Sequence, residues 1–532
     1  QRDFHLGDEM SMEPGAPCEA RVIAGEAGPE LHVGQMAYRV VVVPPGTTLT
    51  QNTARLLREF AAADGPVLAL EPTPVLIDGR PTDEPVLPET ARTVDLASLP
   101  QALDEELPFD VRVPGQHAIW AHHRQVGEAE VYFLANIDHG CGGPATVELR
   151  STGRLEERDP ATGHVHQLPC QQRDGVTRVT LDFPPVGSHL LVMHPRQAPV
   201  LVRRTSEQIV SQIALPDRWE VSLHGPNALT LDTAQVRLGA EDWSEPLHIL
   251  AAHDMIAKAG IGTPFGLRFT FNADVQVPSP TYLAVESPDR FEVAVNGQPI
   301  ASKDAGWWTD ISFRKLDISA AVRAGRNAVV LIGTFGRDSE LESVYVVGDF
   351  GVAGRWLREE NRFNGQVFDR YAPDFRLTAS LTRARAKGGN AVAVDLTAQG
   401  LAFFAGRATL RQTVILPPLD RPFDYAQDRR TLLELRNLRA AVAHMRVNGQ
   451  QAGTVAWQPH HVDVTEALKE GENVIEIELV STLRNLLGPH HLDGGDLAWT
   501  GPKEFRNKNR WTDDYILVPF GLDGAMLTTL DR

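Results

Sequence analysis

Hydrophobic and polar residues alternate along most of the chain from about residue 108 onward. Ala129–Asp138 (AEVYFLANID) and Val176–His194 (VTRVTLDFPPVGSHLLVMH) are two such segments, with turn-forming residues between them. A strand with one face in a core and the other in water has this period of two. Asp159–Gly163 (DPATG) places proline and glycine as a hairpin turn requires. The pattern predicts a compact antiparallel sandwich that ends near Pro195.

The N-terminal part has a different pattern, in which two apolar runs flank a helix-like segment. Tyr38–Pro45 (YRVVVVPP) and Pro66–Leu70 (PVLAL) are continuous runs, as expected of strands buried on both faces. Between them, threonines suited to capping precede Leu56, Leu57 and Phe60, which share one helical face. These residues predict a strand–helix–strand unit of a doubly wound α/β layer.

Residues 198–532 contain an internal repeat. Each copy has a Val-Asn-Gly turn, then Asp-Ile-Ser or Asp-Val-Thr, then a Gly-x-Asn turn that opens an alternating strand. The aspartate and the glycine of Gly-x-Asn are eight residues apart in both copies, at Asp317 and Gly325 and at Asp463 and Gly471. Asn-Gly supplies the positive φ angles of a tight turn, and the aspartate suits the cap of a short helix. Two copies predict two sandwiches of the same kind.

Together these patterns predict a mainly β, multidomain protein built of β-sandwich or jelly-roll domains behind an N-terminal α/β layer. The expected domains are the α/β layer at 1–107, a small antiparallel sandwich at 108–197, and two jelly rolls at 198–370 and 371–532.

Composition narrows the class of partner. The chain has 532 residues and a formal net charge of −18. An acidic surface repels phosphate backbones, so we expect no nucleic-acid partner, whereas a neutral sugar is compatible with this charge. No run of about 18 apolar residues is present, so we expect no membrane span. Cys18, Cys141 and Cys170 are odd in number and widely spaced, which predicts ordinary thiols.

The repeated motif resembles the sugar-binding, galactose-binding-like jelly-roll domain of glycoside hydrolase family 2 and its relatives. The order of segments resembles the C-terminal half of the large, bacterial-type family 106 α-L-rhamnosidases. That order is YRVVVVP…LLREFAAADGPVLAL, VYFLAN…RDPATG…GSHLLVM, and jelly rolls with ESVYVVGDFGV, STLRNLLGPHH and WTDDYILVPFGL. By this resemblance, which covers nearly the whole chain, the N-terminal layer is an amidotransferase-like (flavodoxin-like) remnant that lacks amidotransferase chemistry.

One departure from the family pattern shapes the expected function. Such enzymes are expected to carry their catalytic carboxylates on an N-terminal (β/α)₈ barrel, which needs about 250 residues. No segment here has that repeating pattern, and Phe4–Met10 resembles the join to an upstream part. We therefore expect a non-catalytic C-terminal part of a glycoside hydrolase, inactive without its barrel. The first residue is Gln1 rather than Met, so either a signal has been removed or the sequence is part of something longer. Of the possible locations, a secreted or periplasmic one is favoured.

Glycoside hydrolysis needs two carboxyl groups flanking the scissile bond. The local candidate pairs are Glu340 with Glu342, Glu359 with Glu360, and Asp513 with Asp514. Acidic pairs are more often solvated surface or turn caps, so we assign catalysis to none of them. Glu342, near Asp349, is instead a candidate polar edge residue or ligand of structural calcium, and no other cofactor is expected.

The first repeat copy carries six residues more than the second between its turn and its cap, and these include Trp307, Trp308, Thr309 and Asp310. Flat aromatic faces stack on sugar rings, while polar neighbours hydrogen-bond to hydroxyls. The alternative is that one or both tryptophans pack into an inter-domain core. Trp457, in the corresponding part of the second copy, favours that packing role.

Ser481–Asp496 (STLRNLLGPHHLDGGD) concentrates polar residues near the C-terminus. Adjacent histidines on a strand point to opposite faces, so His490 and His491 seldom bind one metal together. One of them could converge with one of His460–His461 on a metal; the alternative is a hydrogen-bonded loop histidine. Arg484 could satisfy buried carbonyls or reach a substrate held against the absent barrel. The carbohydrate-contact candidates are Trp307, Trp308, Asp310, Arg484, His490 and His491.

Two other hypotheses remain open at this stage. A stand-alone carbohydrate-binding or adhesion module predicts an open sugar groove beside Trp307 and Trp308. A purely structural assembly of sandwiches predicts no glycan binding.

Overall fold

The computed structural model describes residues 5–25, 28–116, 118–198, 208–216, 218–301, 303–361, 367–381, 383–385, 394–416, 429–496 and 500–531. Strands dominate the regular structure, which confirms the predicted mainly β, multidomain class. The chain forms two compact units that meet in sequence near residue 203, with the loops 138–142 and 184–187 grouped with the second. None of the helices in the described residues has the length and apolarity that crossing a bilayer requires.

Unit 1 begins with a small α/β region. Its parallel sheet has the order β4-β6-β9, with α1 and α2 as its helices. A three-stranded antiparallel sheet β1-β2-β3 and a smaller sheet β5-β7-β8 accompany it. The elements are β1 (Ala20–Gly25), β2 (Gly28–Val33), β3 (Met36–Tyr38), β4 (Val41–Val43), β5 (Thr48–Leu49), α1 (Gln51–Ala62), β6 (Val67–Leu70), β7 (Leu76–Ile77), β8 (Arg80–Pro81), β9 (Arg92–Val94) and α2 (Leu99–Glu106).

The predicted strand–helix–strand unit is present, although its first strand is shorter than predicted. Thr50 caps α1, because its side chain accepts a hydrogen bond from the Thr53 amide at 3.2 Å. β6 is buried throughout, as predicted. The run from Tyr38 is divided instead, since Tyr38 ends β3 and only Val41–Val43 pairs with β6. Val42 is exposed, so this strand is covered on one face only.

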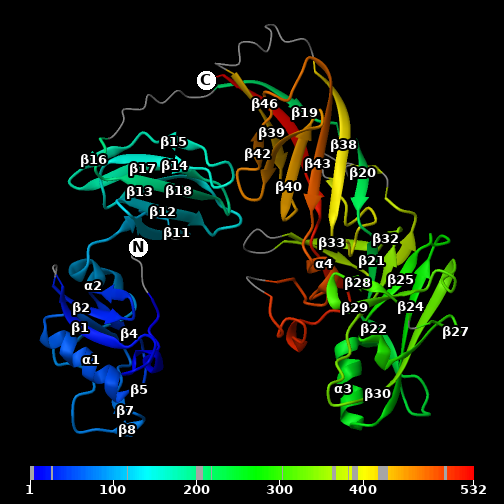
Figure 1. Ribbon diagram of the computed structural model, residues 1–532, viewed down its shortest axis with the longest axis horizontal. Helices are drawn as coiled ribbons and strands as arrows, with labels where there is room; N and C mark the ends of the chain where they lie inside the picture. Colours follow the sequence, from blue (N-terminus) through cyan, green and yellow to red (C-terminus); the bar gives the residue numbers. More distant parts are fainter. Residues whose placement is uncertain are drawn as a thin grey trace. The chain divides into compact units, whose positions relative to one another are not determined.

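The rest of unit 1 is a sandwich of two antiparallel sheets around one apolar core, visible in cyan in Figure 1. One sheet has the order β10-β13-β17-β16 and the other β11-β12-β18-β14-β15. Tyr132 and Leu134 of β12 face the core at 0% exposure, which confirms the alternation seen in the sequence. The strands are β10 (Val111–Arg112), β11 (Ile119–Val126), β12 (Ala129–Asn136), β13 (Gly143–Leu149), β14 (Arg154–Arg158), β15 (Val165–Gln167), β16 (Gln171–Arg173), β17 (Val176–Phe183) and β18 (Ser188–His194).

Unit 2 contains two further sandwiches with separate apolar cores. The first pairs a sheet β21-β31-β25-β29-β28 with a sheet β23-β22-β24-β30-β26-β27, which β32 and β35 extend. Its elements are β21 (Asn227–Leu231), β22 (Thr233–Leu238), β23 (Leu247–His248), α3 (Ile249–Ala259), β24 (Pro264–Ala273), β25 (Thr281–Glu286), β26 (Glu292–Val295), β27 (Gln298–Pro299), β28 (Asp304–Trp308), β29 (Asp310–Asp317), β30 (Gly325–Thr334), β31 (Val344–Gly348), β32 (Gly351–Ala353) and β35 (Arg376–Thr378).

The second sandwich of unit 2 has sheets β19-β46-β39-β42 and β36-β20-β38-β43-β40-β41. Small sheets β33-β34-β44 and β37-β45 complete the unit. The elements are β19 (Gln208–Ala214), β20 (Arg218–His224), β33 (Trp356–Asn361), β34 (Val367–Tyr371), β36 (Arg383–Arg385), β37 (Val394–Asp395), β38 (Arg407–Leu416), β39 (Arg429–Arg436), β40 (Val442–Val447), β41 (Gln450–Val455), β42 (His461–Asp463), β43 (Gly471–Val480), α4 (Arg484–Leu487), β44 (Tyr515–Leu517), β45 (Gly521–Leu522) and β46 (Gly524–Asp531).

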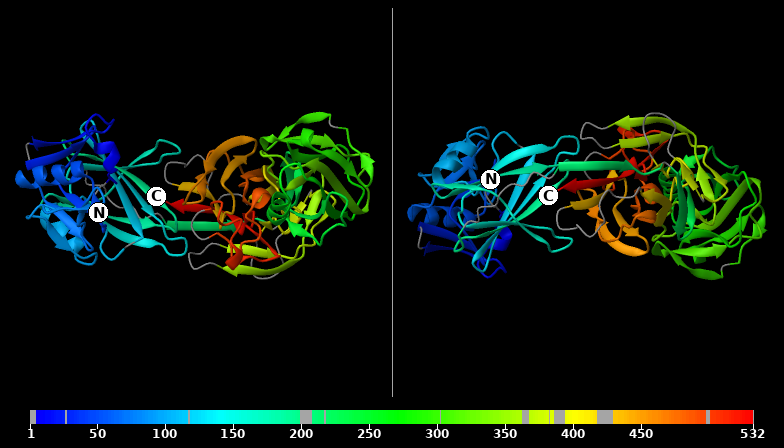
Figure 2. Two further views of the ribbon diagram at one scale, coloured as in Figure 1. Left: turned by 90° about the horizontal axis from the view of Figure 1, so that it is seen from below. Right: turned by 90° about the horizontal axis from the view of Figure 1, so that it is seen from above.

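The path of the chain interleaves these two sandwiches. The sequence-based domain limits, 198–370 and 371–532, follow chain order, whereas β19 pairs with β46 and β20 pairs with β38. β19 runs beside β46, the red strand that ends next to the C-terminus in Figures 1 and 2. The chain therefore starts the second sandwich, builds the first, and then returns to complete the second.

The repeated motif forms the same hydrogen-bonded turn in both sandwiches. In the first copy, Asn296 has φ of 51° and Gly297 has φ of 79°, as the predicted tight turn requires. The Asn296 side-chain amide donates to Asn327 Oδ1 at 2.7 Å. Asn327 is fully buried, accepts from the Arg323 amide at 3.0 Å and donates to the Arg323 carbonyl at 2.7 Å.

The second copy repeats this geometry closely. Asn448 has φ of 53° and its side chain donates to Asn473 Oδ1 at 2.9 Å. Asn473, also fully buried, accepts from the Lys469 amide at 2.9 Å and donates to the Lys469 carbonyl at 2.7 Å. The two copies of the motif are therefore alike in their hydrogen bonds as well as in their sequence.

The aspartate of each motif caps a turn rather than the predicted short helix. Asp317 accepts from the amide and hydroxyl of Ser319 at 2.9 and 2.6 Å, and Asp463 accepts from those of Thr465 at 3.0 and 2.5 Å. The residues that follow form a single hydrogen-bonded turn.

Candidate functional site

A buried polar cluster lies inside unit 2, built from segments far apart in the sequence. Asp232, between β21 and β22, is 1% exposed, and His490 and His491, which follow α4, are each 6% exposed. Asp232 Oδ2 lies 3.3 Å from His490 Nδ1 and 3.2 Å from His491 Nε2. Tyr515 of β44 donates its hydroxyl to Asp232 Oδ1 at 2.5 Å. One carboxylate thus joins both histidines and the tyrosine.

Backbone carbonyls orient both histidine rings. His491 Nδ1 donates to the carbonyls of Thr512 and Asp514 at 3.0 and 3.2 Å. His490 Nε2 donates to the carbonyl of Asn485 at 2.9 Å. Because a carbonyl accepts but cannot donate, each of these nitrogens carries a proton. The second nitrogen of each ring is therefore the one that faces Asp232.

The charge state of the cluster follows from burial and from these contacts. Burial alone would raise the pKa of Asp232, but hydrogen bonds with His490 and His491 hold it well below its usual range. Burial would lower the pKa of His491, yet its hydrogen bond and ion pair with Asp232 raise it above the usual value. Burial lowers the pKa of His490, and Asp232 offsets this only in part. The surroundings thus favour the ionised form of Asp232, and Asp232 favours the protonated form of His491 more strongly than that of His490.

His248 and Trp511 cover one side of this cluster. His248, at the N-terminus of α3, meets the His491 ring edge-on with centroids 5.1 Å apart. Trp511 stacks on His491 at 4.8 Å and meets His248 edge-on at 4.9 Å. Burial is the main reason that the pKa of His248 falls to about 4, so this ring is neutral near pH 7.

Arg484 and Asn485 fasten the same segment to its neighbours. Arg484 forms a two-pronged ion pair with Asp496, with distances of 2.8 and 3.0 Å. Asn485 donates to the Val518 carbonyl and accepts from the Val518 amide, both at 2.7 Å. Asn485 and Asp496 also line a hollow of unit 2 together with Phe404 and Phe520. Two roles were predicted for Arg484, the satisfaction of buried carbonyls and a contact with sugar. Its hydrogen bond to the Ile516 carbonyl at 3.4 Å fits the first role, and the second stays a prediction.

The two tryptophans of the first repeat copy occupy different environments on the hairpin β28–β29. Trp307 is 56% exposed. Trp308 is half-buried and lies 5.5 Å from Tyr345, between ring centroids, within a small apolar cluster that includes Leu486. Thr309 turns the hairpin with φ of 64°. The sugar-stacking hypothesis therefore suits Trp307, because its indole keeps a large surface in water. The packing hypothesis suits Trp308.

Carboxylates gather near this hairpin. Partial burial, followed by the charges of Glu340 and Asp310, raises the pKa of Glu286. Loss of hydration, followed by the charges of Glu286 and Glu340, raises the pKa of Glu342, although much of the residue's surface is exposed. Asp310 accepts from the amide and hydroxyl of Ser312 at 2.8 and 2.7 Å, which lowers its pKa. Glu286 was missed in the sequence because it ends β25, far along the chain from Glu340.

We expect Glu342→Gln to stabilise unit 2 at neutral pH by a few tenths to about 1 kcal/mol. A carboxyl whose folded pKa is raised contributes stability below its unfolded pKa and loses it as the pH rises through the folded pKa. The neutral amide removes that loss, so the gain should be present at pH 7 and absent near pH 4. Thermal unfolding at both values measures it, with exposed Glu241→Gln as the control. An equal shift at both values would contradict this account.

One carboxylate from each of the two remaining candidate pairs binds the same arginine. Arg370 of β34 pairs with Glu360 at 2.5 Å, with Asp514 at 3.2 Å and with Asp493. Burial alone would raise the pKa of Glu360, but hydrogen bonds from Arg370 and Arg358 lower it. Glu360 and Asp514 come from two different candidate pairs, and both serve as anionic partners of Arg370. The segment with Glu340 and Glu342 is a loop before β31 rather than the strand that would align them.

One group of three metal-type ligands converges within the described residues, and it consists of Asp232, His248 and His491. Glu342 and Asp349, the sequence-based calcium candidates, are not members of it; Asp349 instead accepts from the Ser380 hydroxyl at 2.6 Å. His460 and His461 are not members either. The sequence did not predict this group of three ligands, because Asp232 and His491 are 259 residues apart along the chain.

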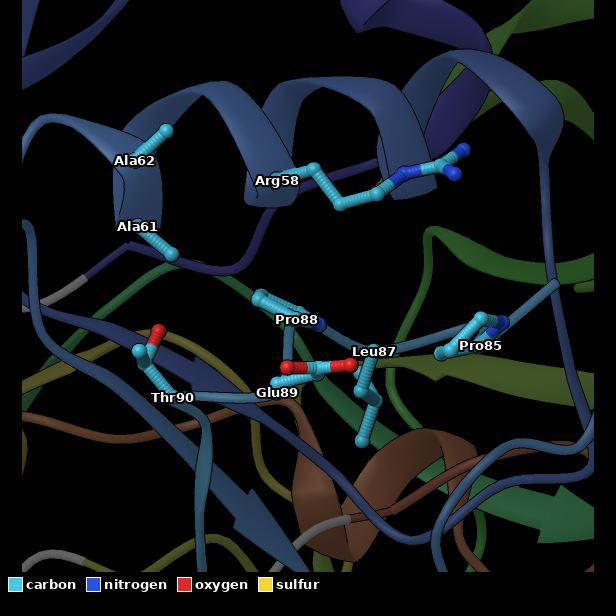
Figure 3. A pocket seen from close by; sticks show the side chains of 8 residues that line it. All are labelled: Arg58, Ala61, Ala62, Pro85, Leu87, Pro88, Glu89 and Thr90. Carbon is cyan, nitrogen blue, oxygen red and sulfur yellow. The ribbon is translucent and has the colours of Figure 1, made fainter.

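Figure 3 shows a separate shallow hollow beside α1 in unit 1, with a volume of about 320 Å³. Its walls are mostly alanine, proline and leucine. Arg58 at its rim is paired with Glu84 at 2.8 Å. We assign no chemistry to this hollow.

Comparisons with known proteins give structural neighbours only. No protein-family model matches the chain, and no curated protein matches it significantly. A rhamnosidase from Novosphingobium sp. PP1Y is 16% identical, with 96% of this chain and 35% of that chain covered and a TM-score of 0.44. An α-L-rhamnosidase from Streptomyces avermitilis, solved with L-rhamnose, is 12% identical, with 70% and 36% covered and a TM-score of 0.23.

An exo-chitosanase from Amycolatopsis orientalis is 14% identical, with 48% of this chain and 29% of that chain covered and a TM-score of 0.19. The solved structures that this chain resembles at low identity are thus rhamnosidases and other glycoside hydrolases. The chain spans about a third of the length of these neighbours.

Proposed function

We propose that this chain is the non-catalytic β-sandwich part of a glycoside hydrolase resembling the family 106 α-L-rhamnosidases, and that it contacts carbohydrate at the β28–β29 hairpin. The observation that carries the proposal is the exposed indole of Trp307 on the hairpin that also carries Asp310. An aromatic face stacks on the apolar face of a sugar ring, and carboxylates accept hydrogen bonds from its hydroxyls. Catalysis itself is assigned to a (β/α)₈ barrel elsewhere in the protein.

The ion pairs of the other acidic residues support the non-catalytic part of the proposal. A glycosidase needs one carboxyl group that keeps its proton at working pH. Glu360 and Asp514 are bound to Arg370, and the pKa of Glu360 is lowered. A guanidinium partner favours the carboxylate form, so these two residues suit domain packing better than proton donation.

Trp307→Ala is expected to weaken binding of rhamnose-terminated oligosaccharides at least tenfold, which corresponds to about 1.4 kcal/mol. Trp457→Ala is the matched control, because Trp457 is 42% exposed in the corresponding part of the second repeat copy. Binding is measured on an oligosaccharide array and then by calorimetry. Trp308→Ala is a poorer test, since Trp308 also packs against Tyr345. Equal losses in the Trp307 and Trp457 variants would reject the hairpin as the contact.

The same purified chain is expected to release no p-nitrophenol from p-nitrophenyl α-L-rhamnoside. Measurable turnover would overturn the non-catalytic assignment while leaving the sugar contact open. Sugar binding through Trp307 by a natural protein without any barrel would instead favour the stand-alone binding module. Failure of every glycan to bind would favour a purely structural assembly.

A further inference from the structure

The convergence of Asp232, His248 and His491 has no part in the carbohydrate proposal. These residues come from the β21–β22 connection, the start of α3 and the segment after α4. One potential ligand atom from each lies within 4.8 Å of the other two. The fold therefore brings one carboxylate oxygen and two imidazole nitrogens together at the edge of a core.

The separation between Asp232 and His491 is compatible with an ion bound between them as well as with the direct hydrogen bond. His491 Nε2 lies 3.2 Å from Asp232 Oδ2. A charge-assisted N–H···O bond is typically about 2.7–2.9 Å long. Two ligands on one tetrahedral metal ion, each bound at about 2.0–2.1 Å, lie about 3.3 Å apart. The observed distance is close to that ligand separation, so an ion could replace the proton between the two groups with little movement of either side chain.

The distance between the rings of His248 and His491 is a second, independent test of the metal-site geometry. Two imidazoles bound through single nitrogens to one tetrahedral ion have ring centres about 5 Å apart. The centroids of His248 and His491 are 5.1 Å apart, with the rings nearly perpendicular at 81°. Binding through His248 Nε2 would place the ring proton on Nδ1, which now accepts from the Leu250 amide at 3.3 Å. Metal binding through His248 Nε2 would therefore break this one long hydrogen bond at the start of α3.

The surroundings resemble those of metal-bound histidines. A ligating histidine usually donates its other ring N–H to a carbonyl or carboxylate, which fixes the ring. His491 does so through Nδ1 to the carbonyls of Thr512 and Asp514. The carboxylate is held in turn, because Tyr515 donates to Asp232 Oδ1. Trp511 stacks over His491 and limits the access of water.

We propose that Asp232, His248 and His491 form a three-ligand site for a divalent transition-metal ion of the Zn²⁺ type, with water in the fourth position. Imidazole nitrogens favour such ions, whereas Ca²⁺ takes six to eight oxygen ligands. The ion would tie the β21–β22 connection, α3 and the segment after α4 together.

The test begins with the full chain freed of metal by a chelator. Titration with Zn²⁺ in a calorimeter is expected to give one tight equivalent, and Co²⁺ is expected to give the visible absorption of tetrahedral coordination. His248→Gln should weaken Zn²⁺ binding at least tenfold and abolish that spectrum. His248 is half-buried at the start of α3, so this variant removes a ligand without emptying the core. Exposed His166→Gln in unit 1 is the matched control.

Wild-type protein supplies a readout that needs no variant. X-ray absorption at the zinc edge should show two imidazole ligands together with oxygen. The proposal is overturned if no equivalent of Zn²⁺ binds, if His248→Gln binds as tightly as wild type, or if His166→Gln removes the binding. It is also overturned if the bound ion lacks two imidazole ligands, since protons alone would then hold the cluster.

Discussion

Replacing Asp232 by alanine is expected to lower the free energy of unfolding of unit 2 by about 3–5 kcal/mol. The carboxylate is 1% exposed and is the shared partner of His490, His491 and Tyr515. Its removal leaves two buried histidines without their shared partner and a buried hydroxyl without its acceptor. Removing one partner of a buried pair lowers stability strongly, because the remaining group is neither hydrated nor hydrogen-bonded to another partner.

Denaturant unfolding in the presence of a chelator measures this change without any contribution from metal. Trp511 stacks on His491, so its fluorescence reports on the neighbourhood of the cluster. Asp242→Ala is the control, because Asp242 is exposed and its loss should change stability by less than about 0.5 kcal/mol. A loss below about 1 kcal/mol for Asp232→Ala would mean that the carboxylate does not hold the cluster together.

Replacing Asn473 by alanine is expected to destabilise the second sandwich by about 2–4 kcal/mol, and Asn327→Ala should do the same to the first. Each asparagine is fully buried and bonds both backbone groups of the residue four positions before it. Each also accepts from the asparagine of the Val-Asn-Gly turn. Alanine leaves these donors and acceptors buried and unsatisfied.

The duplication makes this prediction sharper. The two hydrogen-bond sets agree within 0.2 Å, so we expect similar losses and near-additive effects in the double variant. Thermal and denaturant unfolding measure the losses. Asp317→Ala, which removes only an exposed turn cap, should cost about 1 kcal/mol. A loss in one copy and none in the other would show that the motif is structural in that copy alone.

Sequence patterns correctly predicted the features that depend on interactions between residues close together in the chain. The capped helix α1, the alternating strands of the small sandwich and the Val-Asn-Gly turns were all predicted, because each depends on neighbouring residues. The motif aspartates were predicted to begin helices, and they cap turns instead. The capping chemistry was correct, but the capped segment forms a single turn in each copy.

The contacts that the sequence did not predict are those between partners distant along the chain. Glu360 and Asp514 were considered in separate local pairs, yet both bind Arg370. Nothing near Asp232 marks it as special, because an aspartate after an apolar strand resembles a turn residue. Its contacts with the histidine pair arise only when β21 and the segment after α4 pack against the same core.

The sequence by itself determined the mainly β class, the strand–helix–strand unit and the duplicated turn, because periodicity and turn chemistry act over a few residues. Only the tertiary structure decided that the chain starts one sandwich of unit 2 before it builds the other. It also decided that Trp307 stays in water while Trp308 packs, and that His490 and His491 surround Asp232. These outcomes depend on which distant strands pair and which side chains the cores exclude from water, and no local pattern encodes either.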